Sequence, residues 1–520
     1  MIRLATMVIS KSEFMMFLKH PAWLWLKKFD KEKLPIPDAS LQALFDEGTL
    51  FEGYAEKLFP DAVKLGYKSD KGDFSGTKYY ALPEETSQEI KKGTKFILQG
   101  RLEVDGITST FDVLEKAGEG EFNLYEIKSS TSQKPEHIPD LAFQALVLEK
   151  SGFKVAKTAV IHVNNKYVRQ GAIDPKAIAA ETDVTEEVRE QMPEVEAKIH
   201  DAIECLKNKQ CPDLSPRYVN GGSDVLSEWL TIIQGIKGEF PKYSIYDLCT
   251  VNAQTLGMLE DNGIEMLKDI SLDCELSDKQ LRQVEAMRTG EQSINKDEIE
   301  NFLNELKYPL YFLDYETMSG VIPAFDGYRP YQQVPFQYSL HILPEPPLRQ
   351  GFEGQAGGEL IHKEYLHREF TDPVPELLEH LHNDFDKEGT VISWYMSFEK
   401  SRNSEMAKQV PKYEKFLLGV NDRMVDLMTP FSKGWFVDKD FFGSASIKYV
   451  LPALLPELSY KELAISNGAQ AQQIWMQTVL KGKNPEKKDQ IMKDLIKYCG
   501  LDTYAMYAIF KYLTSRVSQS

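Results

Sequence analysis

An apolar run that ends in two acids opens the C-terminal part of the chain: Leu310-Tyr311-Phe312-Leu313-Asp314-Tyr315-Glu316. The run predicts a buried strand, and residues two apart on a strand point to the same face. Asp314 and Glu316 are therefore neighbours on that face. Because two like charges on an apolar surface are costly unless they bind cations, the sequence predicts a metal site here.

A predicted helix near the C-terminus carries the sequence Tyr498-Cys499-Gly500-Leu501-Asp502. The i, i+4 spacing places Tyr498 and Asp502 on one helix face. With the strand acids, these groups suit hydrolysis by two metal ions. Asp314, Glu316 and Asp502 would hold Mg²⁺ or Mn²⁺, and the Tyr498 hydroxyl would position the attacking water or help to deprotonate it.

These motifs resemble the DnaQ-like 3′-5′ exonucleases of the DEDD superfamily, in the version with tyrosine in the third motif (DEDDy). The resemblance implies an RNase H-like α/β fold and 3′-5′ polarity. It also implies an acid that follows a strand and a phenylalanine, a place held by Glu399 after Phe398. The superfamily more often has Asp there, and Asp426 is a possible substitute or supporting acid.

A second pair of carboxylates occurs in the N-terminal part of the chain. Asp112 falls in one predicted strand, and Glu126 and Lys128 fall in the next, side by side on one face. This layout suits a metal-dependent phosphodiesterase: Asp112 and Glu126 would hold Mg²⁺ or Mn²⁺, and Lys128 would orient a water or offset phosphate charge. The alternative is an ordinary solvent-exposed strand face.

The segments around these residues resemble the PD-(D/E)xK nucleases of the RecB-like branch, including the CRISPR-associated four-cysteine type. They are Ser10-Lys11-Ser12, Phe111-Asp112-Val113-Leu114-Glu115, Tyr125-Glu126-Ile127-Lys128-Ser129-Ser130 and Asp140-Leu141-Ala142-Phe143-Gln144. The resemblance implies a restriction-endonuclease-like fold, a catalytic role for Gln144, and Glu52 as a third metal ligand. A solvated helix glutamate is the alternative for Glu52.

Many of those relatives hold an iron–sulfur cluster with four cysteines. In this chain His20 stands at the first of the four places, and only Cys205 and Cys211 lie in the later region. Four thiolates cannot be assembled from matched positions, so no cluster is expected.

Two further stretches, residues 325–339 and 443–452, resemble one bacterial family of unnamed function. That family joins a RecB-like nuclease domain to a DnaQ-like exonuclease-type domain, and the resemblance covers nearly the whole chain. We expect a RecB-like domain over residues 1–214, a helical connector over 215–305 and an exonuclease-like α/β domain over 306–520. Residues 256–267 of the connector have the texture of a helix-hairpin-helix, with simple packing as the alternative.

Composition limits the class of protein. The chain of 520 residues predicts two or three domains. Its 61 basic and 79 acidic residues give a net charge of -18, which argues against a histone-like DNA wrapper but not against a nucleic-acid enzyme with metal sites. Five scattered cysteines, and the lack of a signal peptide or a long apolar run, predict a cytoplasmic protein.

Contacts to a nucleic-acid strand are expected at a few basic and amide side chains. The lysine-rich stretch from Lys64 to Lys95 is interleaved with aromatic residues and includes Lys91 and Lys92. Other candidates are Arg329, Gln332 and Lys448. Solvated loops, turns and caps are the alternatives for all of them.

The sequence thus predicts a divalent-metal-dependent nuclease with two phosphodiester-hydrolysing sites that cleaves or trims DNA. DNA repair and anti-phage or CRISPR-linked defence are settings by association. One alternative is a nucleic-acid-binding scaffold or regulator in which one or both sites are inactive, and another is a nuclease that acts on RNA.

Overall fold

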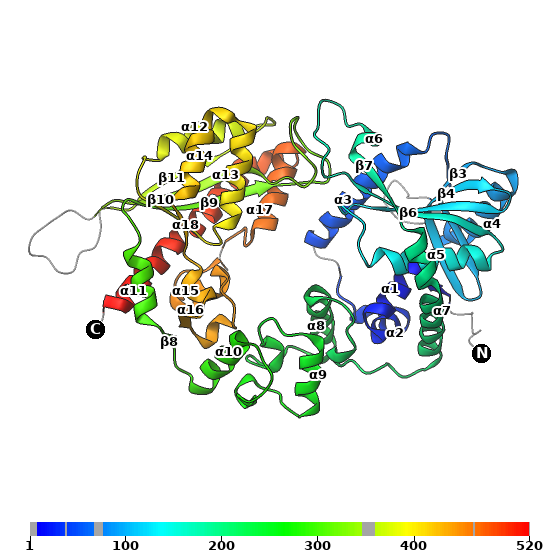
Figure 1. The fold of residues 1–520 in the computed structure, drawn as a ribbon, viewed down its shortest axis with the longest axis horizontal. Coiled ribbons are helices and arrows are strands. Elements are labelled where there is room, and N and C mark those ends of the chain that lie inside the picture. The colour runs from blue at the N-terminus through cyan, green and yellow to red at the C-terminus, as the bar shows by residue number, and fades with distance from the viewer. Residues whose placement is uncertain (1–7, 37–38, 67–75, 346–358, 461–462, 519–520) are drawn as a thin grey trace, which may run out of the picture. The chain divides into compact units, whose positions relative to one another are not determined.

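The computed structural model of the chain describes residues 8–36, 39–66, 76–345, 359–460 and 463–518 (Figure 1). Contacts divide the chain into two compact units. Unit 1 comprises Met1–Phe240, Asn252–Met258 and Gly320–Tyr331, and unit 2 comprises the remainder. Each unit combines sheet and helix, which confirms the α/β class. The connector expected over 215–305 is shared between the units, and the three-domain division stays a prediction.

Unit 1 is built on a seven-stranded sheet with the order β2-β3-β4-β5-β6-β7, and β1 pairs with β4 outside this path. β3, β4 and β5 are antiparallel, whereas β5 and β6 are parallel and are joined by α5 (His137–Lys150). The strands are β1 (Ile9–Ser10), β2 (Val63–Lys64), β3 (Phe96–Val104), β4 (Ile107–Gly118), β5 (Glu121–Lys128), β6 (Lys154–Val163) and β7 (Ala179–Asp183).

Helices cover both faces of this sheet. Phe14 of α1, Phe143 of α5 and Val195 of α7 belong to the core cluster on one face, and Phe51 of α3 belongs to the cluster on the other. The helices of unit 1 are α1 (Lys11–Lys19), α2 (Pro21–Phe29), α3 (Ala39–Ala55), α4 (Gly76–Lys92), α5, α6 (Pro175–Ile178), α7 (Thr185–Lys207) and α8 (Ser223–Lys237). A capping box between Ser10 and Glu13 starts α1, so Lys11 is its first residue.

Unit 2 contains a five-stranded sheet with the order β11-β10-β9-β12-β13. β9 is antiparallel to β10 and parallel to β12. The strands are β9 (Leu310–Met318), β10 (Val334–Leu343), β11 (Ile361–Leu366), β12 (Thr390–Ser393) and β13 (Met424–Asp426), and a separate pair joins β8 (Ser293–Ile294) to β14 (Phe436–Val437).

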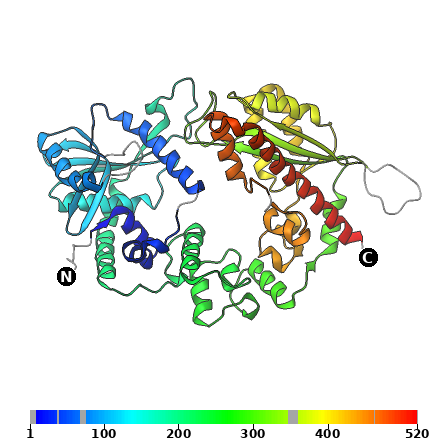
Figure 2. The same cartoon turned by 180° about the vertical axis from the view of Figure 1, so that it is seen from behind.

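Two layers of helices enclose the five-stranded sheet (Figures 1 and 2). α18 (Lys488–Ser518) packs on β9 and β10 from one side, and α12 (Val374–Asp384) packs on β10 and β11 from the other. The remaining helices of this unit are α10 (Asp278–Thr289), α11 (Lys296–Asn304), α13 (Ser397–Gln409), α14 (Glu414–Asp422), α15 (Thr429–Ser432), α16 (Ile447–Leu454) and α17 (Gly468–Trp475).

Alternation along β9 sends its acids toward α18. The Tyr315 hydroxyl donates to Asn403 Oδ1 of α13 at 2.8 Å, so the odd-numbered side chains face α13. Phe312 instead contacts Phe510 of α18. Asp314 and Glu316 share the face of Phe312 and lie against α18, as strand periodicity predicts.

Of the helix-hairpin-helix expected over residues 256–267 of the connector, the structure shows the first helix but not the second. α9 (Ala253–Asp261) ends before Gly263, whose φ of 65° is the left-handed conformation that glycine favours. A three-residue 3₁₀ turn, Leu267–Asp269, then stands where a second helix is expected. Among the described residues, no helix is both long enough and apolar enough to cross a membrane.

Gly389, which precedes β12, tests the packing of the unit 2 sheet. Its φ is 96°, and an added Cβ would lie 2.2 Å from the carbonyl oxygen of Pro309. Gly482 is also left-handed, with a φ of 60°, but has open space at the Cβ position. We expect Gly389→Ala to lower the free energy of unfolding by about 1–3 kcal/mol more than Gly482→Ala does, measured by urea denaturation. Equal losses would contradict this packing.

Candidate functional site

The acids of unit 2 meet at a pocket of about 340 Å³ between β9 and α18. Asp314, Glu316, Tyr498 and Asp502 all line it, so the structure brings these four predicted residues together. Lys448 of α16 lines the same pocket, and its ammonium group interacts favourably with Glu316 and Asp502. Lys448 therefore lies beside the acids rather than on a separate basic surface.

Polar contacts fix α18 against the sheet and so place Tyr498 and Asp502. Thr503 Oγ1 is hydrogen-bonded to Ser339 Oγ at 2.7 Å and to His341 Nδ1 at 2.8 Å, both on β10. Gln337 Nε2, also on β10, donates to the carbonyl of Leu495 at 3.0 Å. Ser339 is the cross-strand partner of Asp314, so these contacts set the position of α18 relative to the strand acids.

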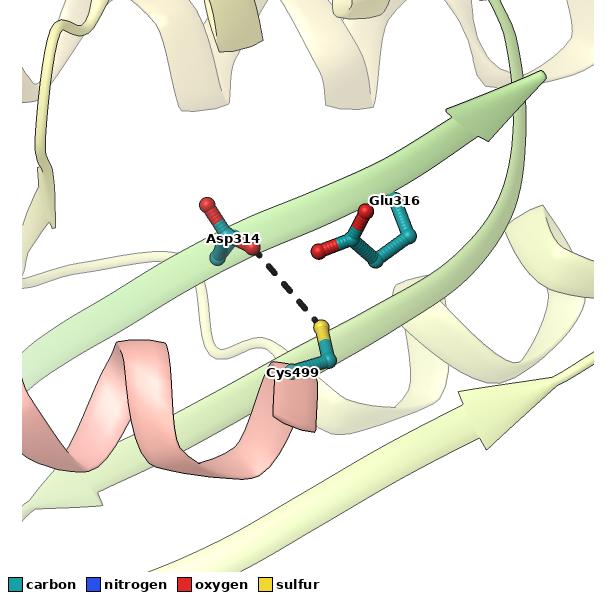
Figure 3. Close-up of side chains that lie close together, drawn as sticks. All are labelled: Asp314, Glu316 and Cys499. Carbon is teal, nitrogen blue, oxygen red and sulfur yellow. Dashed lines mark hydrogen bonds between the residues drawn. The ribbon is translucent and has the colours of Figure 1, made fainter. Parts of the chain in front are cut away.

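Few hydrogen-bond donors reach the carboxylates of this pocket. Glu316 is 6% exposed and accepts no side-chain hydrogen bond from the described residues. Asp314 accepts a weak bond from the Cys499 thiol, with an Sγ–Oδ2 distance of 3.7 Å (Figure 3). Asp502 Oδ1 accepts from the Tyr460 hydroxyl at 2.5 Å. The acids therefore keep most of their acceptor capacity toward the pocket.

Crowding of these acids shifts their protonation. Burial, followed by the charges of Asp502 and Glu316, raises the pKa of Asp314 well above its usual range. Burial and Asp502 likewise raise the pKa of Glu316. Burial raises the pKa of Asp502 to about 6, although the Tyr460 hydroxyl and Lys448 oppose the shift. A divalent cation would relieve the same crowding without protonation.

The same crowded acids also affect the pKa of the Tyr498 hydroxyl. Burial and the charges of Asp502, Glu316 and Asp314 raise the pKa of Tyr498. The phenol therefore keeps its proton in the free protein. This favours positioning of a water over its deprotonation, the two roles left open by the sequence.

Glu399 and Asp426 differ in their surroundings. Glu399 lies in the first turn of α13, is 2% exposed, and its Oε2 has no hydrogen-bond partner among the described residues. It does not line the pocket, but its charge acts on Asp314 and Glu316. Asp426 instead accepts bonds from the backbone N–H groups of Tyr395, Met396 and Met428 at 2.9–3.2 Å. Asp426 thus stabilises the β12–α13 turn.

The predicted residues of unit 1 also converge. Lys128 Nζ donates to Glu126 Oε1 at 2.7 Å, as their shared strand face predicts, and Gln144 Nε2 of α5 donates to Glu126 Oε2 at 2.7 Å. Asp112 Oδ2 accepts from the N–H of Ile127 at 2.8 Å, just beyond the last β4–β5 pair, Val113 with Tyr125.

Gln99 of β3 links Glu52 to Asp112. Gln99 has a φ of 55° and is skipped in the β3–β4 pairing. Its Nε2 donates to Glu52 Oε1 at 2.7 Å and to Asp112 Oδ1 at 3.3 Å. The structure therefore brings Glu52 to the same site as Asp112.

Lys11 and Asp140 also belong to this site, although they were not predicted from the sequence as site residues. Lys11 Nζ lies 2.6 Å from Glu126 Oε1 and 3.2 Å from Asp140 Oδ1, and Lys128 Nζ lies 2.9 Å from Asp140 Oδ2. Although burial alone would raise the pKa of Glu126, Lys11 and Lys128 hold it below its usual range. Burial and Glu126 raise the pKa of Asp112 to about 7.

His20, at the place of the first cluster cysteine, has contacts that need no metal. Its Nδ1 accepts from the N–H of Ala22 at 3.1 Å, which caps α2, and its Nε2 lies 3.1 Å from the carbonyl of Ser215. The ring stacks on Trp229 at a centroid distance of 3.8 Å. Cys205 Sγ donates to the carbonyl of Pro21 at 3.7 Å.

The remaining candidates for nucleic-acid contact are dispersed. Lys92 forms a 2.5 Å ion pair with Glu89, and Lys95 Nζ lies 4.7 Å above the ring of Phe96. Lys91 and Arg329 are exposed in unit 1, and Gln332 is half-buried in unit 2. Residues 67–75 of the lysine-rich stretch lie outside the described residues.

Glu399 predicts a pH dependence of stability. Burial raises its pKa from 4.5 to about 8, so its contribution to stability is fully present below about pH 4.5 and is lost as pH rises through about 8. In a metal-chelating buffer, Glu399→Gln should gain stability relative to wild type over this range by at least about 1 kcal/mol. Urea denaturation at several pH values measures this, with exposed Glu414→Gln as control. Parallel curves would contradict it.

Residues 311–446 match a family described as a domain of unknown function, DUF2779. The chain is 24% identical over 244 residues to the uncharacterized protein MG366 of Mycoplasma genitalium, covering 43% of this chain and 35% of that protein. It is 23% identical over 219 residues to the homologue of that protein in Mycoplasma pneumoniae, covering 39% and 32%. The chain thus spans about a third of the length of these curated relatives.

Proposed function

We propose that the protein is a divalent-metal-dependent nuclease with two hydrolytic centres that act on DNA. The observation that carries the proposal is the unit 2 pocket, where Asp314, Glu316 and Asp502 converge with few donors to neutralise them. Their oxygens are the ligands that Mg²⁺ and Mn²⁺ prefer. The proposal includes an RNase H-like, DnaQ-like unit 2 with 3′-5′ exonuclease activity.

The side chains around the pocket suit phosphodiester hydrolysis. Bound ions would act as Lewis acids and would lower the pKa of a bound water. Asp314, Glu316 and Asp502 would hold the ions, and Glu399, which interacts electrostatically with Asp314 and Glu316, would support them. The Tyr498 hydroxyl would orient the water, and Lys448 would contact a phosphate at the rim.

We propose a PD-(D/E)xK-type centre for unit 1. Glu52, Asp112, Glu126 and Asp140 supply four carboxylates, while Lys11 and Lys128 supply two ammonium groups. This balance leaves two negative charges, which one divalent cation would offset. Gln144 positions Glu126, and Lys128 would orient the water or stabilise the phosphate.

Single substitutions should separate the two activities. Asp314→Asn is expected to lower 3′-5′ trimming by about a hundredfold or more, because the change removes an anionic metal ligand. Glu126→Gln should leave that trimming intact and abolish the other cleavage. A time course with end-labelled single-stranded and duplex DNA in Mn²⁺ measures both, with Asp489→Asn, at an exposed site on α18, as control. Intact substrates with metal-loaded wild type would refute the proposal.

One observation favours a second function for unit 1, a nucleic-acid-binding platform without catalysis. Lys11 and Lys128 already contact Glu126, so this carboxylate is less dependent on a cation than Glu316. The same lysines would then contact a phosphate backbone. Either centre would also accept RNA as an alternative substrate, because both would act on phosphodiesters.

Calorimetric titration with Mn²⁺ separates these functions for unit 1. If both units are metal-dependent centres, Glu126→Gln and Glu316→Gln should each lower the number of bound ions relative to wild type, since each removes an anionic ligand. A platform in unit 1 predicts that Glu126→Gln leaves the number unchanged. Unchanged binding in Glu316→Gln would contradict the metal centre of unit 2.

A further inference from the structure

A thiol lies among the acids of the unit 2 pocket. Ligand atoms of Asp314, Glu316 and Cys499 all lie within 4.8 Å of one another. Figure 3 shows the two acids on β9 and the thiol on α18 turned toward one another. Cys499 is fully buried, and Glu316, which is 6% exposed, has no side-chain hydrogen-bond partner among the described residues. A buried carboxylate that accepts no side-chain hydrogen bond from the described residues, beside a thiol, indicates an unfilled ligand set.

The spacing fits coordination of one ion. Zn–S and Zn–O bonds of about 2.3 and 2.1 Å at a tetrahedral angle separate sulfur from oxygen by roughly 3.6 Å. Cys499 Sγ and Asp314 Oδ2 are 3.7 Å apart. An ion could therefore replace the S–H···O hydrogen bond with little movement of either atom.

The chemistry of the thiol determines which cations it would coordinate. In the free protein Cys499 is a neutral thiol, because its S–H group donates to Asp314 Oδ2. A hard ion such as Mg²⁺ prefers oxygen and gains little from sulfur. Zn²⁺ and Cd²⁺ form strong bonds to thiolate. On binding, the sulfur–hydrogen bond breaks, the metal–sulfur bond forms and one proton passes to solvent.

We propose that Asp314, Glu316 and Cys499 form a mixed oxygen–sulfur site for a single thiophilic divalent cation of the zinc class. The site itself does not require nuclease activity. Its consequence, competition between Zn²⁺ and Mg²⁺ or Mn²⁺ for shared carboxylates, rests on the proposed function.

The other cysteines provide a matched contrast. Cys205, Cys211, Cys249 and Cys274 are half-buried. In the part of the chain that the structure describes, none of them belongs to a compact group of three metal-ligating side chains. A substitution at Cys274 therefore controls for general cadmium binding by thiols.

Ultraviolet titration of the reduced 520-residue chain with Cd²⁺ tests the site, because cadmium thiolates have a charge-transfer band. We expect wild type and Cys274→Ser to share a saturable band that Cys499→Ser loses. Cd²⁺ should bind Cys499→Ser at least about tenfold more weakly, the lower end of what loss of an outer-shell partner costs. Identical spectra and affinities for wild type and Cys499→Ser would overturn the proposal.

Two further measurements keep the test decisive. If Cys499→Ser does not fold, cadmium NMR of wild type distinguishes ligation by one sulfur with oxygens from ligation by oxygen alone, and an oxygen-only signal rejects the site. DNA cleavage by wild type in Mn²⁺ is measured separately. No cleavage with an intact Cys499-dependent band contradicts the nuclease alone, and cleavage without that band contradicts the thiolate site alone.

Discussion

Repulsion between carboxylates that the fold holds together is the constraint on which unit 2 depends. Two unit charges 4.8 Å apart repel by roughly 3 kcal/mol at an effective dielectric constant of 20. That is a large part of the stability of an ordinary domain. β9 fixes Asp314 and Glu316, and Thr503 fixes α18 against β10, so the side chains cannot simply move apart. Protonation or a bound cation must offset the repulsion.

The hydrogen bonds that each carboxylate accepts distinguish acids with a structural role from acids with a functional one. Asp426 accepts three backbone N–H groups and stabilises a turn, whereas Glu316 is as buried as a core residue and has no such donors within the described part of the chain. In unit 1, Glu126 accepts from Lys11, Lys128 and Gln144. The two units thus manage crowded acids differently: unit 1 uses lysines, and unit 2 leaves acceptor capacity for a cation.

Local periodicity explains which parts could be predicted. The period of two on β9 and β5 placed Asp314 beside Glu316 and Glu126 beside Lys128, and the i, i+4 spacing on α18 placed Tyr498 with Asp502. The same helical spacing links Asp140 to Gln144, so Asp140 could have been recognised. Lys11 and Tyr460 could not, because Lys11 lies 115 residues from Glu126 and Tyr460 lies 42 residues from Asp502. Contacts at such separation follow from tertiary packing.

Binding of a divalent cation by the unit 2 acids is the property on which the proposed function depends. Anomalous X-ray scattering from crystals of the wild-type protein soaked in Mn²⁺ tests it most directly, because the peak locates the ion independently of activity. We expect a manganese peak in contact with the carboxylates of Asp314 and Glu316, and we expect a Glu316→Gln crystal to lose it. Saturating Mn²⁺ with no peak in this pocket, and with the acids hydrogen-bonded to each other as neutral groups, would contradict it.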